Sequence, residues 1–337
     1  MKSGTVARYV RDWRLMEERS NADARVPRDA SRPSVIYVMG AGRSGSTILG
    51  VALGNCENVF FAGELNQWLA RSGAPSLGDA RRTGFWDIVR RDMAVAPELF
   101  GGAASCLERS SALLDPRKWL ARRRLRQPYR GASEDLYRTI KRAAGATYIV
   151  DTSHYPSRAR EVQALRGIDL YLLFLARDPQ SVVASLGRDD VPERTFGAYT
   201  ANAYLWLTNM LSLVVFLRHP RDRRLFVRHE DFIASPERVL RQILQQVGSA
   251  ASTPDMRSLR TGVPFHGNRL IRSEQITLKR HPAMLAERSR VTALLQLPWA
   301  AILSRLRPSA SVSASHEDPT FDLHSPDVHA RAGKQAP

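Results

Sequence analysis

Residues 35–47 read Val-Ile-Tyr-Val-Met-Gly-Ala-Gly-Arg-Ser-Gly-Ser-Thr, and an apolar helical pattern follows directly. A short apolar run, a glycine-rich turn and a helix start form the arrangement that holds a phosphate on backbone N–H groups. A nucleotide-triphosphate loop has the pattern G-x-x-x-x-G-K-[ST]. Gly40 and Gly45 have this spacing, but Ser46 stands in the lysine position and the cation of the loop is Arg43. The stretch therefore predicts an anion site that differs from a site for a triphosphate with magnesium.

Apolar runs and helical patterns alternate along the rest of the chain. This alternation predicts an α/β fold of three layers, with a mostly parallel central sheet and helices on both faces, as in P-loop nucleotide triphosphatases. In such sheets ligands bind at the carboxyl ends of the strands. We expect further strands at 58–62, 147–150, 170–175 and 225–227, and helices at 134–143, 156–165, from 179, at 196–217 and at 236–247.

Composition divides the chain into a core and flanking segments. Residues 1–33 are charged and are predicted to be peripheral, with one helix at 6–16. Residues 34–307 are predicted to form the α/β domain. Within it, residues 71–130 are rich in glycine, proline and arginine and lack periodicity, so we expect a helical or irregular cap insertion over the site. Polar residues without periodicity predict a disordered tail at 308–337.

Overall composition narrows the class of protein. Of the 337 residues, 43% are hydrophobic, which is enough to bury a sizeable core. The two cysteines, Cys56 and Cys106, supply neither a disulfide framework nor a metal-ligand spacing. The most apolar stretch, 204–217, is shorter than the roughly 20 residues that span a bilayer and predicts a buried helix. Residues 1–30 lack the apolar core of a signal peptide, so we expect a cytoplasmic protein.

The chain is strongly basic, with a formal net charge of +17. This charge suits an anionic small ligand, a nucleic acid, or an anionic surface such as lipid or acidic glycan. Segment 117–130 carries seven basic residues and no acidic one, with Trp119 and Tyr129 among them. It fits a solvated arginine-rich face, a membrane-surface helix, or a docking site for an acidic acceptor or a lipid-linked glycan.

A second cationic site follows the clearest strand. Arg177 comes just after the apolar run at 170–175, and Asp178 with the proline after it marks a helix start. Ser185 lies eight residues after Arg177, about two turns into this helix. A guanidinium fork suits a phosphate, and a hydroxyl adds a donor. Because this site and the 40–47 loop both leave the carboxyl edge of the sheet, the sequence predicts two neighbouring anion sites.

Together these motifs resemble the sulfotransferases that use 3′-phosphoadenosine 5′-phosphosulfate (PAPS). The resemblance covers about residues 34–290 and includes stretches similar to bacterial members at 229–237 and 266–272. It implies transfer of the sulfuryl group to a hydroxyl or amine of a carbohydrate, glycolipid or natural-product acceptor, with adenosine 3′,5′-bisphosphate as the second product. Because a sulfuryl group is singly charged, positioned donors suffice for its transfer and no metal is expected.

The resemblance also implies residues for the donor. Arg177 and Ser185 would hold its 3′-phosphate, and Arg269 and Arg272 would close over it. Arg43 would stabilise charge on the bridging and sulfonate oxygens. The loop residues that would hold the 5′-phosphosulfate are Gly42, Arg43, Ser44, Gly45, Ser46 and Thr47.

A general base is expected beside the transferred group, because the acceptor loses a proton as it attacks. Glu64 follows the strand predicted at 58–62 and resembles the Gly-Glu of tyrosylprotein and bacterial sulfotransferases, in which the glutamate is taken as the base. His154 stands where bacterial relatives commonly have a lysine, and cytosolic sulfotransferases use a histidine base. The candidate catalytic residues are therefore Glu64, Arg43 and His154, with Glu64 preferred as the base.

Two other classes of function stay open from the residues alone. The glycines and the run at 148–151, which is similar to a magnesium-binding strand end, fit a P-loop nucleotide-dependent kinase, although the lysine is missing. The basic segment 117–130 fits a nucleic-acid or membrane-surface binding protein. We expect no nucleic-acid partner, and we leave open a peripheral contact of this segment with the inner face of a membrane.

Overall fold

The structure is a computed structural model that describes residues 31–109, 112, 115–187, 197–280, 289–306 and 321–324. Most of the predicted peripheral segment 1–33, including the helix at 6–16, lies outside the described residues. Within the predicted tail 308–337 the structure describes one short strand, β8 (Phe321–His324). The remainder of that prediction also lies outside the described residues.

A five-stranded parallel sheet forms the centre of the fold, with strand order β2-β3-β1-β4-β5. The parallel α/β fold predicted from the alternating pattern is thereby confirmed. The strands are β1 (Ser34–Met39), β2 (Val59–Gly63), β3 (Tyr148–His154), β4 (Asp169–Ala176) and β5 (Arg224–Arg228). A smaller antiparallel sheet joins β6 (Leu259–Arg260), β7 (Gln275–Arg280) and β8.

The central strand β1 shows why helices cover both faces of the sheet. Successive side chains of a strand point to opposite faces, and all six residues of β1 are buried. Val35 and Tyr37 belong to one hydrophobic core, whereas Ile36 and Val38 belong to the other. Each face of the sheet therefore needs its own layer of helices, which gives the three layers that the sequence predicts.

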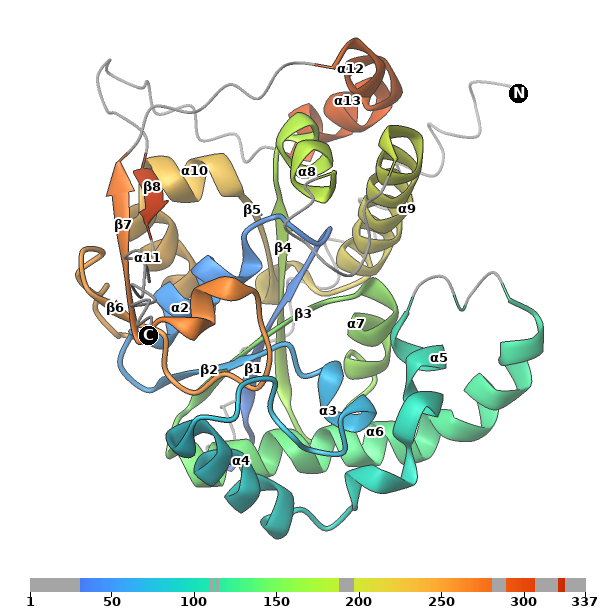
Figure 1. The fold of residues 1–337 in the computed structure, drawn as a ribbon, viewed down its shortest axis with the longest axis vertical. Helices are drawn as coiled ribbons and strands as arrows, with labels where there is room; N and C mark the ends of the chain where they lie inside the picture. The colour runs from blue at the N-terminus through green and yellow to red at the C-terminus, as the bar shows by residue number, and fades with distance from the viewer. Residues whose placement is uncertain are drawn as a thin grey trace, which may run out of the picture. The chain divides into compact units, whose positions relative to one another are not determined.

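Helices cover both faces of the sheet (Figure 1). One layer contains α3 (Gln67–Ala70), α4 (Ala80–Asp92), α5 (Ser105–Glu108), α6 (Arg117–Ala144), α7 (Pro156–Val162), α9 (Ala198–Leu217) and α13 (Leu297–Leu306). The other contains α2 (Ser46–Gly54), α10 (His229–Ala234) and α11 (Pro236–Gln246). Helices α8 (Pro179–Leu186) and α12 (Arg290–Leu295) pack beside α9. Short 3-10 turns are η1 (Pro97–Leu99), η2 (Gly101–Ala104), η4 (Arg221–Arg223) and η5 (Arg269–Arg272).

The helix predicted at 134–143 is wrong in its start, because it is the second half of the 28-residue helix α6. Tyr129, Leu136 and Ile140 lie at helical spacing and are buried in the core beneath the sheet. This packing outweighs the cost of Pro128 inside the helix. Segment 71–130 thus supplies much of one helical layer as well as the irregular stretches that its composition indicates.

Arg122 differs from the exposed basic residue that the sequence suggests. It is buried, and its guanidinium donates to the backbone carbonyl of Cys106 in α5. The neighbouring Arg123 and Arg124 are exposed. Arg122 therefore ties α5 to α6, and it does not belong to the basic surface of α6.

The described part of the chain holds one helix long and apolar enough to cross a membrane, α9. Its buried side carries polar residues, and Asn202 donates to Thr292 of α12 over 3.1 Å. Val215 and Phe216 of the same helix pack in the core of the sheet. The apolar stretch at 204–217 is therefore part of a core helix, as predicted.

Candidate active site

The carboxyl ends of all five parallel strands lead into stretches that the sequence motifs single out. The 40–47 loop follows β1, Glu64 follows β2, His154 ends β3, Arg177 follows β4 and His229 follows β5. Parallel strands end at one edge of a sheet, and ligands bind in the crevice outside that edge. The fold thus brings together residues that are far apart in the sequence.

The start of the loop is wedged between two strand ends. The Gly40 N–H donates to the His154 carbonyl over 3.3 Å. On the other side, a Cβ built on Gly40 would lie 2.3 Å from the carbonyl oxygen of Leu175, and φ is +140°. Only glycine fits such a close approach in this backbone conformation. The loop is therefore held by both neighbours of β1.

The centre of the loop has two left-handed residues, Arg43 at φ 70° and Gly45 at φ 90°. The Arg177 guanidinium donates from Nη1 to the Arg43 carbonyl over 3.0 Å. Gly45 caps α2 and has no side chain, so no capping side chain takes the N–H groups of the first turn. Such N–H groups at a helix N-terminus suit an anion. The loop thus fits a phosphate-bearing ligand, with both arginines at its rim.

His229 packs against the loop at Gly45. A Cβ on Gly45 would lie 2.4 Å from His229 Nδ1. Burial, and secondarily the charge of Arg177, lower the pKa of His229 to about 3, so the ring is neutral at physiological pH. Its Nδ1 has no hydrogen-bond partner among the described residues. The sequence identifies His229 only as part of a motif, and its contact with the loop comes from the tertiary structure.

Tyr204 of α9 is a site residue that the sequence analysis did not identify. Its hydroxyl oxygen accepts from the Gly42 N–H over 3.3 Å. Burial raises the pKa of this phenol. A tyrosine within an apolar helical stretch carries no local signal of a loop contact. Its role follows from the packing of α9 beside the edge of the sheet.

Glu64 lies at the same edge, with 17% of its side chain exposed. His266 Nδ1 lies 3.1 Å from Glu64 Oε2. Burial raises the pKa of Glu64, but the hydrogen bond from His266 and the charges of His154, His266 and Arg43 outweigh burial, so the pKa lies below its ordinary value. Glu64 is therefore an ionised carboxylate that faces the guanidinium of Arg43 and the imidazoles of His154 and His266.

His154 has a left-handed backbone, with φ 50°. Non-glycine residues adopt this conformation uncommonly, and such strain is often found at functional sites. The imidazole ring lies against Tyr155, with ring centroids 4.4 Å apart. His154 thus lies next to the loop and within electrostatic range of Glu64.

The remaining predicted residues lie on α8, on η5 and in the loop itself. Ser185 is in the second turn of α8, which Asp178 caps by accepting from the Ser181 N–H over 3.0 Å. Arg269 and Arg272 are exposed on η5, which packs against α2. Of the loop residues, Ser44 and Thr47 are buried, whereas Gly42, Arg43, Gly45 and Ser46 are partly exposed.

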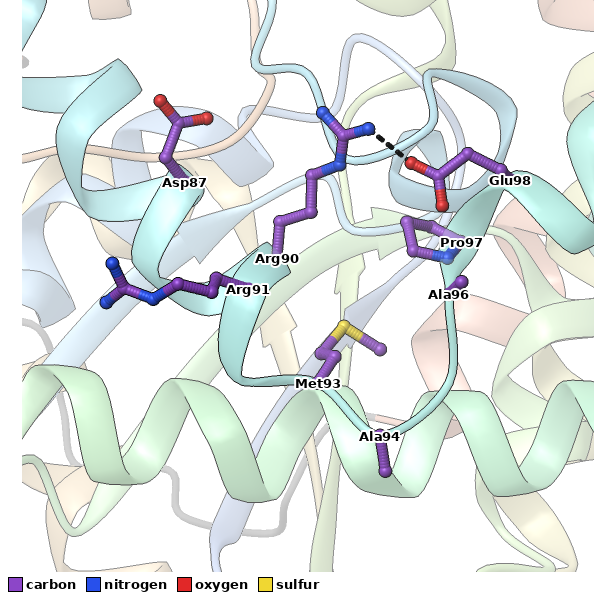
Figure 2. Close-up of a pocket in the computed structure, with 8 residues that line it drawn as sticks. All are labelled: Asp87, Arg90, Arg91, Met93, Ala94, Ala96, Pro97 and Glu98. Carbon is purple, nitrogen blue, oxygen red and sulfur yellow. Dashed lines mark hydrogen bonds and ion pairs between the residues drawn. The ribbon is translucent and has the colours of Figure 1, made fainter.

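A hollow elsewhere on the surface involves none of these residues. It has a volume of about 400 Å³ and lies at the carboxyl end of α4, where Arg90 pairs with Glu98 (Figure 2). Its lining is mostly charged or small, with Met93 as the largest apolar member. The carboxyl edge of the parallel sheet is therefore the better candidate for the active site.

A sequence model of the sulfotransferase family matches residues 33–253. The chain belongs to the sulfotransferase family. It is accordingly a PAPS-dependent enzyme. No curated protein sequence matches the chain significantly.

Solved structures of bacterial sulfotransferases are similar to this sulfotransferase at low identity. The sulfotransferase domain of the Synechococcus PCC 7002 olefin synthase is 19% identical over 86% of this chain and 94% of its own, with a TM-score of 0.46. The sulfotransferase domain from the curacin biosynthetic pathway is 20% identical over 70% and 79%, with a TM-score of 0.43. STF9 from Mycobacterium avium is 15% identical over 82% and 77%, with a TM-score of 0.45.

In this sulfotransferase Asp151 does not act as the magnesium-binding strand end of a kinase. Its side chain is fully buried. It accepts from the Tyr137 hydroxyl over 2.6 Å, from Arg158 over 3.3 Å and from the Ser153 backbone N–H over 2.9 Å. The carboxylate that the kinase interpretation requires is therefore committed to the protein interior.

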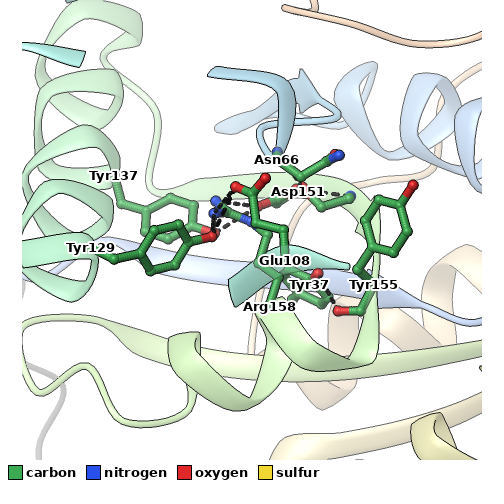
Figure 3. Close-up of polar contacts among 9 residues, drawn as sticks. Tyr37, Asn66, Glu108, Tyr129, Tyr137, Asp151, Tyr155 and Arg158 are labelled. Atoms are coloured by element: carbon green, nitrogen blue, oxygen red, sulfur yellow. Dashed lines mark hydrogen bonds and ion pairs between the residues drawn. The ribbon is translucent and has the colours of Figure 1, made fainter. Parts of the chain in front are cut away.

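Asp151 of β3 belongs to a buried polar network with side chains of α5, α6 and α7 (Figure 3). Arg158 lies at its centre and also contacts Tyr129, which in turn donates to Glu108 over 3.0 Å. Burial raises the pKa of Glu108 to about 7, against the charge of Arg158. The network reaches the site through Ser153, whose Oγ donates to Asp151 and accepts from the Asn66 N–H. Ser153 thus links the ends of β2 and β3.

We predict that Arg158→Met destabilises the sulfotransferase by about 3–5 kcal/mol, because it leaves buried Asp151 without its cation. Equilibrium urea unfolding measures this loss. Arg91→Ala, which removes an exposed pair with Asp92, serves as the control and should change stability by less than about 1 kcal/mol. Equal stability of the two variants would show that the network adds nothing to folding.

Proposed function

We propose that this sulfotransferase moves the sulfuryl group of PAPS to a hydroxyl or amine of a carbohydrate, glycolipid or natural-product acceptor. One observation carries the proposal: three features lie at the carboxyl edge of the sheet, although they follow different strands. They are the 40–47 loop after β1, Arg177 after β4 and the ionised carboxylate of Glu64 after β2. The site thus offers hydrogen-bond donors to the anionic substrate PAPS. A carboxylate that can accept a proton lies beside them.

The loop residues 42–47 would hold the 5′-phosphosulfate. The support is the glycine-capped start of α2 and the placement of Arg43 and Arg177 at the loop. Arg177 and Ser185 would hold the 3′-phosphate, since one follows β4 and the other lies on the helix that begins there. Arg269 and Arg272, on a turn against α2, would close over the donor.

Glu64 would act as the general base, with His154 as helper or rival. As the acceptor oxygen forms its bond to sulfur, the bond from sulfur to the bridging oxygen of the 5′-phosphate breaks. The acceptor proton passes to the Glu64 carboxylate, and adenosine 3′,5′-bisphosphate leaves. Arg43 would stabilise the charge that grows on the bridging and sulfonate oxygens.

Calorimetry with nucleotides tests the donor site. We expect the wild-type protein to bind adenosine 3′,5′-bisphosphate more tightly than ADP or adenosine 5′-phosphate. Arg177→Ala should weaken the bisphosphate by roughly thirtyfold, or about 2 kcal/mol, and adenosine 5′-phosphate much less. Ser185→Ala, which leaves the Arg177–Arg43 contact intact, should show the same selectivity to a smaller degree. Equal losses for both nucleotides would contradict the 3′-phosphate assignment.

A second measurement tests the base. Glu64→Gln keeps the shape of the side chain and an acceptor for His266 but removes the proton acceptor. Turnover of PAPS to adenosine 3′,5′-bisphosphate should fall by about 10²–10⁴-fold, while calorimetric binding of the bisphosphate is retained. Glu98→Gln, on an exposed pair, is the matched control. Near-normal turnover of Glu64→Gln would transfer the role of base to His154.

We also propose that the first half of α6 makes a peripheral contact with an anionic membrane surface. Trp119 and Leu120 are 59% and 58% exposed, beside exposed Arg123 and Arg124. Apolar and basic side chains together are typical of helices that lie on anionic lipid.

Co-sedimentation tests this contact, with vesicles of phosphatidylglycerol and phosphatidylcholine against phosphatidylcholine alone. Arg123→Gln/Arg124→Gln should lower binding to the anionic vesicles by about thirtyfold, since each cation contributes about 1 kcal/mol. Leu294→Ala removes an exposed apolar side chain on α12 and serves as the control. Equal binding to both kinds of vesicle, or none, would overturn the proposal.

A further inference from the structure

Glu64 and His266 are joined twice, although they are 202 residues apart. The Glu64 backbone N–H donates to the His266 carbonyl over 2.9 Å. The two side chains meet at 3.1 Å through His266 Nδ1 and Glu64 Oε2. Both side chains are partly exposed, at 29% for His266 and 17% for Glu64. The pair therefore has a defined geometry and is accessible from the crevice.

The residue before Glu64 permits this double contact. Gly63 has φ +78°, and a Cβ on it would lie 2.3 Å from the His266 carbonyl oxygen. Any other residue would push the 264–267 segment away from the end of β2. The Phe265 N–H also donates to the Ala62 carbonyl over 2.8 Å. The backbone of His266 is therefore docked onto β2 just where Glu64 begins.

An aromatic cluster holds the same segment from the other side. The Phe265 ring lies 5.0 Å from the ring of Trp68 and 5.1 Å from that of Trp86. Trp86 of α4 also donates from its indole N–H to the Val263 carbonyl over 2.8 Å. Phe265, Trp68 and Trp86 are all fully buried. His266 thus lies in an irregular segment that buried aromatic packing and backbone hydrogen bonds hold on both sides, and such support is what a precise contact requires.

The protonation of the contact follows from the chemistry of its two groups. An ionised carboxylate only accepts hydrogen bonds. Glu64 is ionised at neutral pH, so His266 Nδ1 carries the hydrogen and donates it. A neutral His266 then keeps its proton on Nδ1, and Nε2 is unprotonated.

We propose that His266 is a positioning residue for the transfer reaction: its Nδ1–H holds Oε2 of Glu64 and so aims the second carboxylate oxygen at the acceptor. This proposal rests on the proposed role of Glu64 as the base. It adds a residue that does not itself touch the reacting atoms and acts through Glu64.

The surroundings of Glu64 give the proposal a pH signature. The charged or titratable groups that face Glu64 are His266, His154 at the end of β3, Arg43 in the loop, and the phenols of Tyr155 and Tyr204. Without His266, burial is opposed by fewer groups and the pKa of Glu64 rises. The carboxylate is the active form of the base, so the acidic limb of the kcat/KM profile moves to higher pH.

Three substitutions of His266 test the contact. The readout is the turnover of PAPS, either by hydrolysis with water as the acceptor or with an acceptor found in a screen. His266→Ala should lower kcat by about a hundredfold, because the base is no longer aimed, with the KM for PAPS unchanged and the acidic limb shifted upward. His266→Asn puts an amide N–H where Nδ1 lies and should restore most of kcat. His266→Gln puts it where Nε2 lies and should not.

The outcomes separate the two proposals. If His266→Asn is as impaired as His266→Ala, the imidazole itself transfers the proton and the positioning role is overturned. Wild-type kcat and pH profile in His266→Ala overturn it as well. If the wild-type protein neither binds adenosine 3′,5′-bisphosphate nor turns over PAPS, the proposed function fails instead.

A measurement without turnover tests the contact directly. In ¹⁵N-histidine-labelled protein, NMR at a pH at which the His266 ring is neutral should show the tautomer with its proton on Nδ1, assigned by comparison with His266→Asn. Glu64→Ala should abolish this preference. A neutral wild-type His266 ring with its proton on Nε2 would overturn the proposal, whatever the activity.

Discussion

The parallel pairing of β1 between β3 and β4 is the constraint on which the site depends. Ser34 pairs with Tyr148 on one side and Asp169 on the other, so the strands run in step toward the loop. The register then shifts near the end of β1, where Met39 stands opposite His154. Such irregularities re-aim side chains beside active sites. Here the shift brings the carbonyl of His154 to the first N–H of the loop.

Arginine has two separate uses in this sulfotransferase. Arg158 is buried and balances Asp151 within a network of tyrosine hydroxyls, where it holds the ends of β2 and β3 through Ser153. Arg43 and Arg177 lie at the crevice instead, where one contacts the backbone of the other. A buried charge must be paired inside the protein, whereas a charge at the crevice can meet an anionic ligand. Net charge alone does not distinguish these uses.

The candidate base depends on contacts from distant parts of the chain. His266 reaches Glu64 from a late segment that Trp86, Trp68 and Phe265 hold in place. The region 71–130, which has little periodicity, supplies one of these anchors through α4. A helix of one layer on the sheet thus helps to position the candidate base through Trp86.

The sequence by itself determined the parallel α/β fold, the glycine-rich loop after β1 and the arginine after β4, because each depends on local signals: apolar runs, glycine spacing and a helix cap. Only the tertiary structure decided that His266 pairs with Glu64, that Tyr204 accepts from Gly42 and that His229 packs on Gly45. These partners lie on separate elements, so no spacing in the sequence reports them. Helix α6 shows the same limit, because burial of Tyr129 and Leu136 outweighed the proline and arginine content that suggested irregular structure.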